Sequence, residues 1–344
     1  MGVDIGSIIP KKEISFDDLR NKIVVIDAFN TIYQFLATIR QPDGTPLMDR
    51  KGNITSHLNG IYYRSLNLMT KGIKLIYVFD GKSPEQKYAE KERREKIKEE
   101  ARKKYKEAIE AGEIEEAAKY AKQTIRITDE MIKETKKLLD GMGLPYIQAP
   151  SEGEAQAAYM TKVRKEIYGV GSQDYDCLLY GATRLILNLT LAKKRKTATG
   201  AKVPVNPQLV ELDNVLNNLQ IDLDRLICLG IIVGTDFNPM GIKGIGPKKA
   251  LSIVKQFKYP VEIFNYLKKK YVLDFDWKEI FELFKKPEVN KNFDYEFKKP
   301  NKEKIIKILC IDHDFSEERV INALEKLEKS EEEKKQENLR KWFE

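Results

Sequence analysis

The residues with the clearest capacity for chemistry are acidic side chains that directly follow short apolar runs. Glu152 and Glu154 stand just after the run 144–147 and open the Ala-rich segment 155–165. This order predicts a buried strand followed by a helix, with both carboxylates in the first helical turn. The spacing also fits a capping box with Ser151 as N-cap, so this pair alone leaves a purely structural role open.

Further carboxylates end other apolar runs, and together they favour a functional site. The runs 22–26, 74–79 and 168–171 lead into Asp27, Asp80, Asp174 and Asp176. Aspartate is a common turn residue, which would explain each position taken alone. In a parallel sheet, however, the carboxyl ends of the strands share one edge, and ligands bind there. Like charges at one edge repel one another and need a counter-charge, which divalent cations would supply.

The remaining composition narrows the chemistry to oxygen ligands. The chain has two histidines, His57 and His313, and three widely separated cysteines. These are too few for a His-based metal site, a zinc cluster or a Ser-His-Asp triad, so we expect magnesium or manganese. A phosphatase-type aspartate nucleophile would need a second Asp two positions after Asp27, where Phe29 stands. Metal-assisted hydrolysis is therefore favoured over a covalent route.

Apolar runs that alternate with helical patterns predict an α/β fold with a mostly parallel central sheet flanked by helices. The chain has 344 residues, 42% of them hydrophobic, which is enough for a catalytic domain with appendages. The scattered cysteines indicate a reducing, intracellular setting. The longest apolar run, 226–234, is too short to span a membrane, and no signal-peptide pattern precedes it.

Clustered basic residues favour a polyanionic partner over simple solvation, and the net charge is +8. A long helix predicted within 82–106 lacks an apolar face, and we interpret it as a phosphate-gripping lid, with a solvated spacer as the alternative. The segment 193–202 predicts an exposed basic loop or hairpin, with simple solvation as the alternative. After a seventh carboxylate, Asp236, the glycines and lysines of 242–250 would let a helix amino end hold a phosphate without reading sequence.

The charged stretch 330–335 predicts a linker. It leads into a short terminal segment that contains aromatic residues. Exposing these aromatic side chains to water on a polar tail is unfavourable, so we expect them to dock on the protein or on a partner.

These motifs together resemble the flap endonuclease family of structure-specific 5′ nucleases over essentially the whole chain. The resemblance rests on segments 24–27, 79–82, 149–155, 174–176, 234–236 and 244–246. It implies a basic helical arch and a carboxy-terminal helical DNA-binding region with a helix-hairpin-helix motif. It also implies cleavage of flap DNA near the junction of single and double strands, with 5′–3′ exonuclease activity, in Okazaki fragment processing and repair.

The resemblance further implies residue roles. Two magnesium ions, replaceable by manganese, would be bound by Asp27, Asp80, Glu152, Glu154, Asp174, Asp176 and Asp236. Catalysis would involve Lys87, Arg94 and Asp176. Contacts with DNA would come from Gly2, Tyr33, Arg93, Lys193, Lys194, Arg195, Gly244, Gly246, Lys248, Lys249, Phe315, Glu317 and Arg319. Tyr33 would stack on a terminal base, and 315–319 would form part of a pocket for one unpaired 3′ nucleotide. The hairpin would also offer a site to a monovalent cation.

The tail residues Gln336, Leu339, Trp342 and Phe343 match the family's sliding-clamp-binding box. The implied partners are therefore branched DNA and a sliding clamp, without a membrane, for a monomer that docks on the clamp ring beside the chromosomal DNA. We expect a nuclease part at 1–123 that includes the arch at about 82–123, a second nuclease part at 124–260, a helical region at 261–329 and the tail at 330–344.

Three alternatives to this interpretation remain. One is a related nuclease for bubbles, gaps or four-way junctions, against which stands the absence of a long insertion between the lid and Glu152. Another is a non-catalytic junction-binding scaffold tethered to a clamp, which would have little use for seven intact carboxylates. The third is an RNA-directed nuclease on the same sheet, although such domains are usually small and lack the hairpin.

Overall fold

A seven-stranded sheet forms the centre of the computed structural model, which describes residues 2–41, 44–84, 87–190, 194–196 and 202–343. Its strands, in spatial order, are β1 (Lys12–Glu13), β9 (Gln208–Glu211), β6 (Arg184–Leu187), β5 (Ile167–Gly171), β2 (Ile23–Asp27), β3 (Lys74–Phe79) and β4 (Tyr146–Gln148). The five strands from β6 to β4 pair in parallel, whereas β9 is antiparallel to both of its neighbours. The predicted mostly parallel sheet is confirmed.

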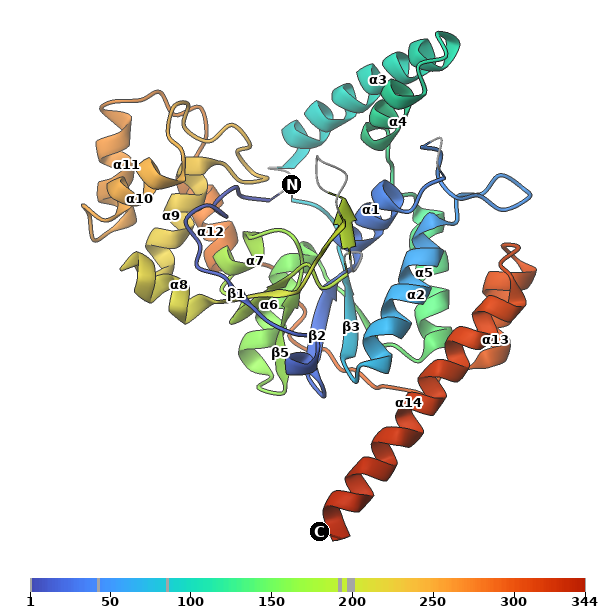
Figure 1. Cartoon of the computed structure of the whole chain (residues 1–344). Helices are drawn as coiled ribbons and strands as arrows, with labels where there is room; N and C mark the ends of the chain where they lie inside the picture. Colours follow the sequence, from blue (N-terminus) through green and yellow to red (C-terminus); the bar gives the residue numbers. More distant parts are fainter. Residues whose placement is uncertain (1, 42–43, 85–86, 191–193, 197–201, 344) are drawn as a thin grey trace.

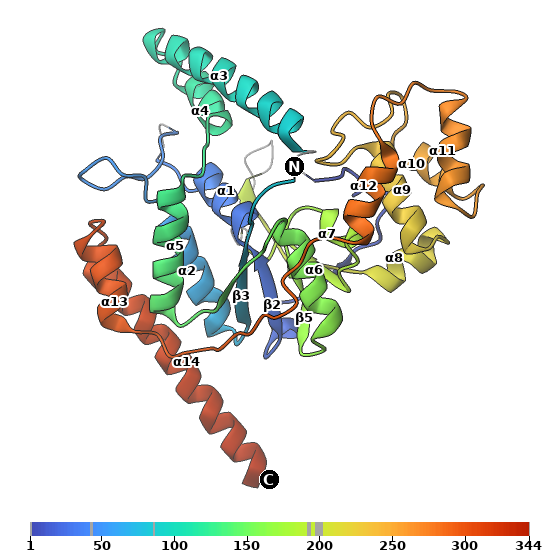
Figure 2. The ribbon, with the colours of Figure 1, turned by 180° about the vertical axis from the view of Figure 1, so that it is seen from behind.

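Alternating side chains of β2 explain why helices cover both faces of this sheet (Figures 1 and 2). Val24 and Ile26 pack into one core, and Val25 packs into the other. Because successive side chains of a strand point to opposite faces, an unbroken apolar run must be covered on both sides. The first core is closed by α1 (Ala28–Thr38), α2 (Ser56–Thr70) and α5 (Asp129–Met142), and the second by α6 (Gly153–Val163), α7 (Asp176–Leu179), α8 (Leu212–Leu219) and α9 (Leu223–Val233).

The predicted basic helix is present as α3 (Tyr88–Glu110), which pairs with α4 (Ile114–Gln123) in an arch that projects from the body (Figure 1). Gly112 joins the two helices with a φ of 73°, a value that suits glycine. The sequence shows no apolar face on α3, yet the arch has one, a narrow row of buried alanines: Ala101, Ala108, Ala117 and Ala121. Small side chains let the helices approach closely and leave the lysines and arginines outside.

The carboxy-terminal part first extends the second core and then returns to the first. It begins with α10 (Pro247–Val254), α11 (Pro260–Lys268) and α12 (Trp277–Lys285), where Phe264 stacks on Trp277 with ring centroids 4.3 Å apart. The chain then crosses to α13 (Lys302–Ile306), a π-helical turn (Lys307–Ile311) and α14 (Glu317–Phe343), which lies along α2 (Figure 2).

The stretch 330–335 is not a linker, and that prediction is wrong. The backbone of α14 continues through it to Phe343, away from the body (Figure 1). Lysine and glutamate are good helix formers, and their i,i+4 pairs stabilise an exposed helix, so charge alone did not indicate a break.

Two other findings concern the surface. The predicted basic hairpin is present as the antiparallel pair β7 (Lys194–Lys196) and β8 (Lys202–Pro204). None of the helices among the described residues combines the length and the apolar character that a membrane crossing requires.

Candidate active site

The ends of several elements bring the seven predicted carboxylates to the carboxyl edge of the sheet. Asp27 is the last residue of β2, and Asp80 directly follows β3. The other five come from the starts of α6 and α7, the turn after β5 and the turn after α9: Glu152, Glu154, Asp174, Asp176 and Asp236. Segments more than 200 residues apart in the chain thus supply one acidic cluster.

The start of α6 removes the structural explanation for the glutamate pair. The N-cap of α6 is Glu152, and no side chain forms a capping hydrogen bond there, so the alternative of a capping box around Ser151 is not borne out. Instead, the backbone N–H of Gly153 donates to Asp80 Oδ1 at 2.7 Å. A Cβ at position 153 would lie 2.5 Å from that same oxygen, so glycine permits this close approach. The helix start therefore orients a carboxylate of the neighbouring strand.

Asn30 also orients carboxylates, and the sequence alone did not single it out. Its backbone N–H donates to Asp27 Oδ1 at 3.0 Å, and its side-chain Nδ2 donates to Asp174 Oδ2 at 2.7 Å. One residue therefore links the ends of β2 and β5. The first bond follows from Asp27 being the N-cap of α1, which the sequence could have suggested, whereas the second depends on tertiary structure.

The amino-terminal segment is a further part of the site. Val3 N–H donates to Asp176 Oδ1 at 2.8 Å. The adjacent Gly2 lies directly against the cluster, since a Cβ there would come within 2.8 Å of Asp176 Oδ2. Gly2 was predicted as a DNA contact, and the structure puts it beside the carboxylates.

Two cations of α3 reach the acidic cluster. Lys87, the N-cap of α3, pairs with Glu152 and lies 3.3 Å from Asp236 Oδ2, and Arg94 Nη2 lies 2.7 Å from Asp236 Oδ1. Burial alone would lower the pKa of Lys87, but its carboxylate neighbours outweigh burial and raise it. Burial would likewise raise the pKa of Asp236, yet Lys87 and Arg94 lower it. The arch thus meets the carboxylates through these two side chains.

Most of the other carboxyl groups remain electrostatically uncompensated. Burial, followed by repulsion from Asp80 and Asp174, raises the pKa of Asp27 to about 8. Burial and like charges also raise the pKa of Asp176 to about 7 and that of Asp80 to about 6. The pKa of Glu154 is raised for the same reasons. Such a cluster favours any ligand that brings positive charge.

The donor set fits magnesium, although its side chains do not form a ready-made coordination shell. Within the described parts of the chain, no three histidine, cysteine, aspartate or glutamate side chains converge closely enough to hold an ion by themselves. Magnesium binds oxygen and usually keeps several waters, with only one or two carboxylates in direct contact. An all-carboxylate cluster with excess negative charge meets that requirement.

Several predicted DNA contacts lie on open surfaces around the site. Tyr33 is 44% exposed on α1, and Arg93 is exposed on α3. At the hairpin, Gly244 has a φ of 82° and Gly246 is the N-cap of α10, and no atom lies within 4 Å of a Cβ built at either. The following residues Lys248 and Lys249 are exposed on the first turn of α10. A helix amino end with free N–H groups is therefore accessible.

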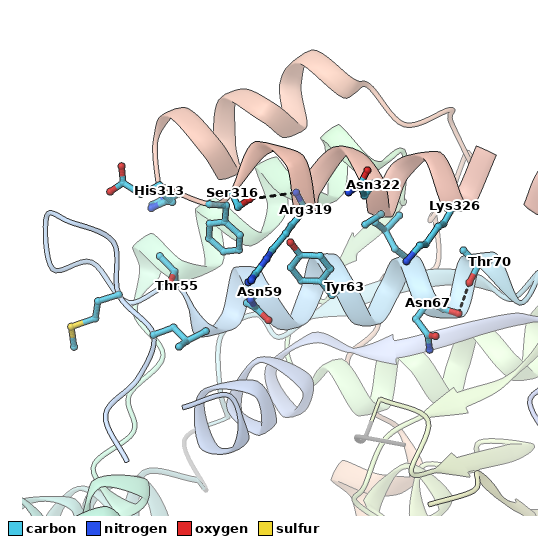
Figure 3. A pocket seen from close by; sticks show the side chains of 16 residues that line it. Thr55, Asn59, Tyr63, Asn67, Thr70, His313, Ser316, Arg319, Asn322 and Lys326 are labelled. Atoms are coloured by element: carbon cyan, nitrogen blue, oxygen red, sulfur yellow. Dashed lines mark hydrogen bonds between the residues drawn. The ribbon is translucent and has the colours of Figure 1, made fainter. Parts of the chain in front are cut away.

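A second region of predicted contacts lines a cavity of about 690 Å³ between α2 and α14 (Figure 3). Phe315 and Arg319 form part of its wall, as expected, and Arg319 extends toward Asn59 on α2. Glu317 is exposed and does not line the cavity. The sequence did not predict the α2 side of this cavity, where Tyr63 and Asn67 contribute.

Some predicted residues lie outside the described part of the structure. This applies to Lys193 and to the side chains of Lys194 and Arg195. It also applies to the side chains of the tail box, Gln336, Leu339, Trp342 and Phe343, whose backbone belongs to α14.

Comparison with known proteins first defines the class. A family model described as XPG N-terminal domain matches residues 5–101, and one described as XPG I-region matches residues 143–236. The catalytic core of Rad2, solved in complex with a DNA substrate, shares the fold at 22% identity, with a TM-score of 0.68 over 92% of this chain and 96% of that chain. The class is thus that of proteins with the XPG N-terminal domain and the XPG I-region.

Closer relatives define the family. A curated protein named Flap endonuclease 1 from Thermococcus onnurineus is 52% identical over 344 residues, which cover 100% of this chain and 99% of that protein. The solved flap endonuclease-1 from Methanococcus jannaschii is 45% identical, with a TM-score of 0.76 over 97% of this chain and 100% of that chain. The chain belongs to the flap endonuclease family. It is a structure-specific 5′ flap endonuclease, a metal-dependent hydrolase of phosphodiester bonds, and the family acts in DNA replication and repair.

The raised pKa values predict how stability depends on pH when divalent cations are chelated. In the folded protein Asp27, with a pKa of about 8, keeps a proton that the unfolded chain releases near pH 4. Stability should therefore fall as pH rises from about 4 to about 8. Asp27→Asn should flatten this slope and stabilise the protein at pH 8 by at least about 1 kcal/mol, the equivalent of one pKa unit. Denaturant titrations from pH 5 to 9 measure the effect.

A matched control for this experiment is Asp213→Asn, which changes an exposed carboxylate on α8. It should keep the wild-type slope. An Asp27→Asn protein whose stability falls with pH as steeply as that of the wild type would contradict the electrostatic account.

Proposed function

We propose that the seven carboxylates bind two magnesium ions, for which manganese can substitute, and that this centre cuts flap DNA at the junction of single and double strands. The observation that carries the proposal is the uncompensated negative charge at the sheet edge, with Asp27, Asp80 and Asp176 all shifted toward protonation. When bound, the magnesium ions supply the missing counter-charge, activate the attacking water and stabilise the leaving oxygen.

The carboxylates would act as a preorganised set of ligands. Gly153 N–H, Val3 N–H and Asn30 hold the oxygens of Asp80, Asp176 and Asp174 in fixed directions. Outer partners of this kind fix the orientation of metal ligands and commonly affect metal affinity by about 10- to 100-fold. Val3 also ties the amino-terminal segment, including Gly2, to the place where the substrate would enter.

Lys87 and Arg94 would bind the scissile phosphate and offset the charge that develops on it. Both already lie at the carboxylates, within 3.3 Å of Asp236. A phosphate that arrives between the arch and the sheet edge would offer these cations an alternative anionic partner. Positive groups fixed where charge develops lower the barrier most effectively when water is excluded.

The rest of the substrate would be recognised by shape. The arch would admit a single-stranded 5′ end, with Arg93 in contact with its backbone, and Tyr33 would stack on the terminal base. The open N–H groups at Gly244 and Gly246, with Lys248 and Lys249, would hold a duplex phosphate as a helix-hairpin-helix motif, and a monovalent cation would fit the same turn. The basic β7–β8 hairpin, which carries Lys194 and Arg195, would add further backbone contacts.

The cavity between α2 and α14 would take one unpaired 3′ nucleotide. Its volume of about 690 Å³ suffices for a nucleotide, and its lining combines aromatic, amide and cationic groups. Tyr63 and Phe315 offer apolar surface for the sugar or base, whereas Arg319 and Lys326 offer charge to a phosphate. The same combination of groups suits a nucleotide better than an apolar ligand.

The carboxy-terminal helix would carry the clamp-binding box. Because α14 runs away from the body, Gln336, Leu339, Trp342 and Phe343 stand far from the carboxylates (Figure 1). We propose a monomer tethered to a sliding clamp by this end of α14 and kept close to chromosomal DNA. The division into parts at 1–123, 124–260, 261–329 and 330–344 also stays a proposal.

The central prediction concerns cleavage. With magnesium, the protein should cut a 5′-labelled double-flap DNA at a single position near the junction, and chelator should abolish the cut. Asp176→Asn should reduce the cleavage rate at least about a thousandfold, since it removes an inner oxygen ligand, while binding to the junction stays intact. Single-turnover cleavage and fluorescence anisotropy measure the two effects.

Asp213→Asn is the control, because its carboxylate lies exposed on α8. Binding lost in parallel with cleavage would contradict a catalytic role for Asp176. Tight, salt-sensitive binding without any cleavage by the wild type would favour the scaffold alternative.

A second prediction concerns Asn30. Asn30→Leu keeps the approximate volume but removes the donor to Asp174, so the magnesium concentration for half-maximal cleavage should rise about tenfold or more. The rate at saturating magnesium should change much less. Calorimetric titration with manganese provides a readout independent of cleavage, and an unchanged manganese affinity would show that the hydrogen bond does not orient a metal ligand.

A third prediction concerns the tail. The double substitution Trp342→Ala and Phe343→Ala should abolish stimulation of cleavage by a sliding clamp and retention on the clamp in gel filtration. Cleavage in the absence of a clamp should stay at the wild-type rate, because α14 ends far from the carboxylates (Figure 1). Full clamp stimulation in the double variant would locate the clamp contact elsewhere.

A further inference from the structure

The two histidines of the chain meet at a single carboxylate. His57 Nε2 lies 3.2 Å from Glu134 Oε2, and His313 Nε2 lies 3.4 Å from Glu134 Oε1. On its other side, His313 Nδ1 lies 3.1 Å from Asp49 Oδ2. The four side chains therefore form a row in the order Asp49, His313, Glu134, His57. None of these contacts takes part in the carboxylate cluster.

The row is largely shielded from water. The side chains of His57 and Asp49 are 0% exposed, that of His313 is 8% exposed and that of Glu134 is 19% exposed. Burying ionisable groups is costly unless they pair and hydrogen-bond. A buried row of this kind is therefore expected to hold its members in one arrangement.

Each member comes from a different segment of the fold. Asp49 belongs to the loop 44–55, His57 to α2, Glu134 to α5 and His313 to the turn before α14. Asp49 Oδ1 also folds its own loop by accepting from the N–H groups of Lys51 and Asn53, at 2.9 Å and 2.8 Å. The row thus joins a folded loop to two helices and to the carboxy-terminal turn.

A second contact fastens the same loop to the same turn. Arg50 N–H donates to Asp314 Oδ2 at 2.9 Å, and Asp314 has a φ of 58°. A positive φ is uncommon for residues other than glycine, although aspartate adopts it more readily than most. The hydrogen bond from Arg50 ties this turn, 312–315, to the loop.

The loop and the turn form one end of the cavity between α2 and α14. Leu47, Met48 and Thr55 line it from the loop side, and His313, Asp314 and Phe315 line it from the turn. Figure 3 shows His313 at this end, with Lys326 and Thr70 at the opposite end. Any change in how the loop meets the turn would alter the shape of the cavity there.

The pKa shifts of the four side chains favour one distribution of charge along the row. Hydrogen bonds that His313 donates to Glu134 and Asp49 outweigh burial and raise the pKa of His313, whereas burial lowers the pKa of His57. Burial opposes ionisation of Glu134 and Asp49, yet their hydrogen-bond partners lower the pKa of each to about 2. The raised pKa of His313 thus favours a protonated imidazole between the two carboxylates, and the lowered pKa of His57 favours its neutral form. Once His313 loses its proton, two buried carboxylates remain without a cation between them.

We propose that Asp49, Glu134 and His313 are positioning residues that hold the loop 44–55 against the turn 312–315 and so set the enzyme's preference for a substrate with one unpaired 3′ nucleotide. This inference rests on the proposed function of the cavity. The other charged residues at this end are Asp314 in the turn and Arg319 on α14, which line the cavity, and Arg50 in the loop, whose backbone N–H donates to Asp314. All three lie outside the row of buried contacts.

The experiment compares two DNA substrates that differ only by one unpaired 3′ nucleotide, using the full-length enzyme with magnesium. The readout is the ratio of kcat/KM for the substrate with that nucleotide to kcat/KM for the substrate without it. Glu134→Gln removes the charge at nearly constant shape and should lower this ratio about fivefold, the loss expected from one buried hydrogen bond. The loss should appear in KM, while kcat on the substrate without the nucleotide stays unchanged.

A pH series supplies a readout that a general loss of stability would not reproduce. In the wild type, the ratio should fall as pH rises through the raised pKa of His313, because the cation that joins the carboxylates is lost. In Glu134→Gln the ratio should already be low and should depend less on pH. Glu130→Gln is the matched control, with the same chemical change at an exposed position on α5, and should behave as wild type.

The possible outcomes separate this inference from the function on which it rests. A wild-type ratio of one would overturn the assignment of the cavity and this inference with it. A wild-type ratio well above one that Glu134→Gln leaves unchanged at every pH would overturn only the positioning role. Should Glu134→Gln fail to fold, Asp49→Asn provides the same comparison from the loop side, with the same expected loss.

Discussion

Mutual repulsion among buried carboxylates at the carboxyl edge of the sheet is the constraint on which the rest of this structure depends. Asp27, Asp80, Glu154 and Asp176 all have raised pKa values because burial and like charges act together. A protein accepts that cost only where a ligand relieves it. The parallel strands of the sheet end in a rigid row, and this row keeps the carboxylates close together despite their repulsion.

The segments around this edge either orient the carboxylates or place positive charge beside them. Gly153, Val3 and Asn30 donate hydrogen bonds that set the directions of individual oxygens. The arch presents Lys87 and Arg94 at the same place. The row of buried alanines in the arch lets its two highly charged helices pack closely, with most of their basic side chains outside the contact. Lys87 and Arg94 of the arch and the negative charge of the edge thus lie together, an arrangement that suits the binding of a phosphate.

On the far side of the first core, the loop 44–55 and the turn 312–315 are held in a fixed relation. There a row of alternating carboxylates and imidazoles adds to the apolar packing of Ile54 and Phe315. Such a row fixes geometry more narrowly than packing alone, because each hydrogen bond has a preferred direction and the two central side chains, His313 and Glu134, each contact two partners. The edge cluster has excess negative charge and favours a cationic ligand, whereas in this row each carboxylate contacts an imidazole, and the row gives rigidity.

The sequence by itself determined the sheet, the seven carboxylates, the basic arch and the glycine hairpin, because each depends on local order: apolar runs of strand length, acidic residues at their ends, charge runs and turn residues. It misjudged the stretch 330–335, where charged residues fit both a linker and an exposed helix, and at the start of α6 it left open a capping box that is not formed. Only the tertiary structure decided that Asn30 bridges two strands, that Val3 binds Asp176 and that His57, His313, Glu134 and Asp49 form one row. These contacts join residues far apart in the chain, and no spacing rule encodes them, because they arise only when packing brings the segments together.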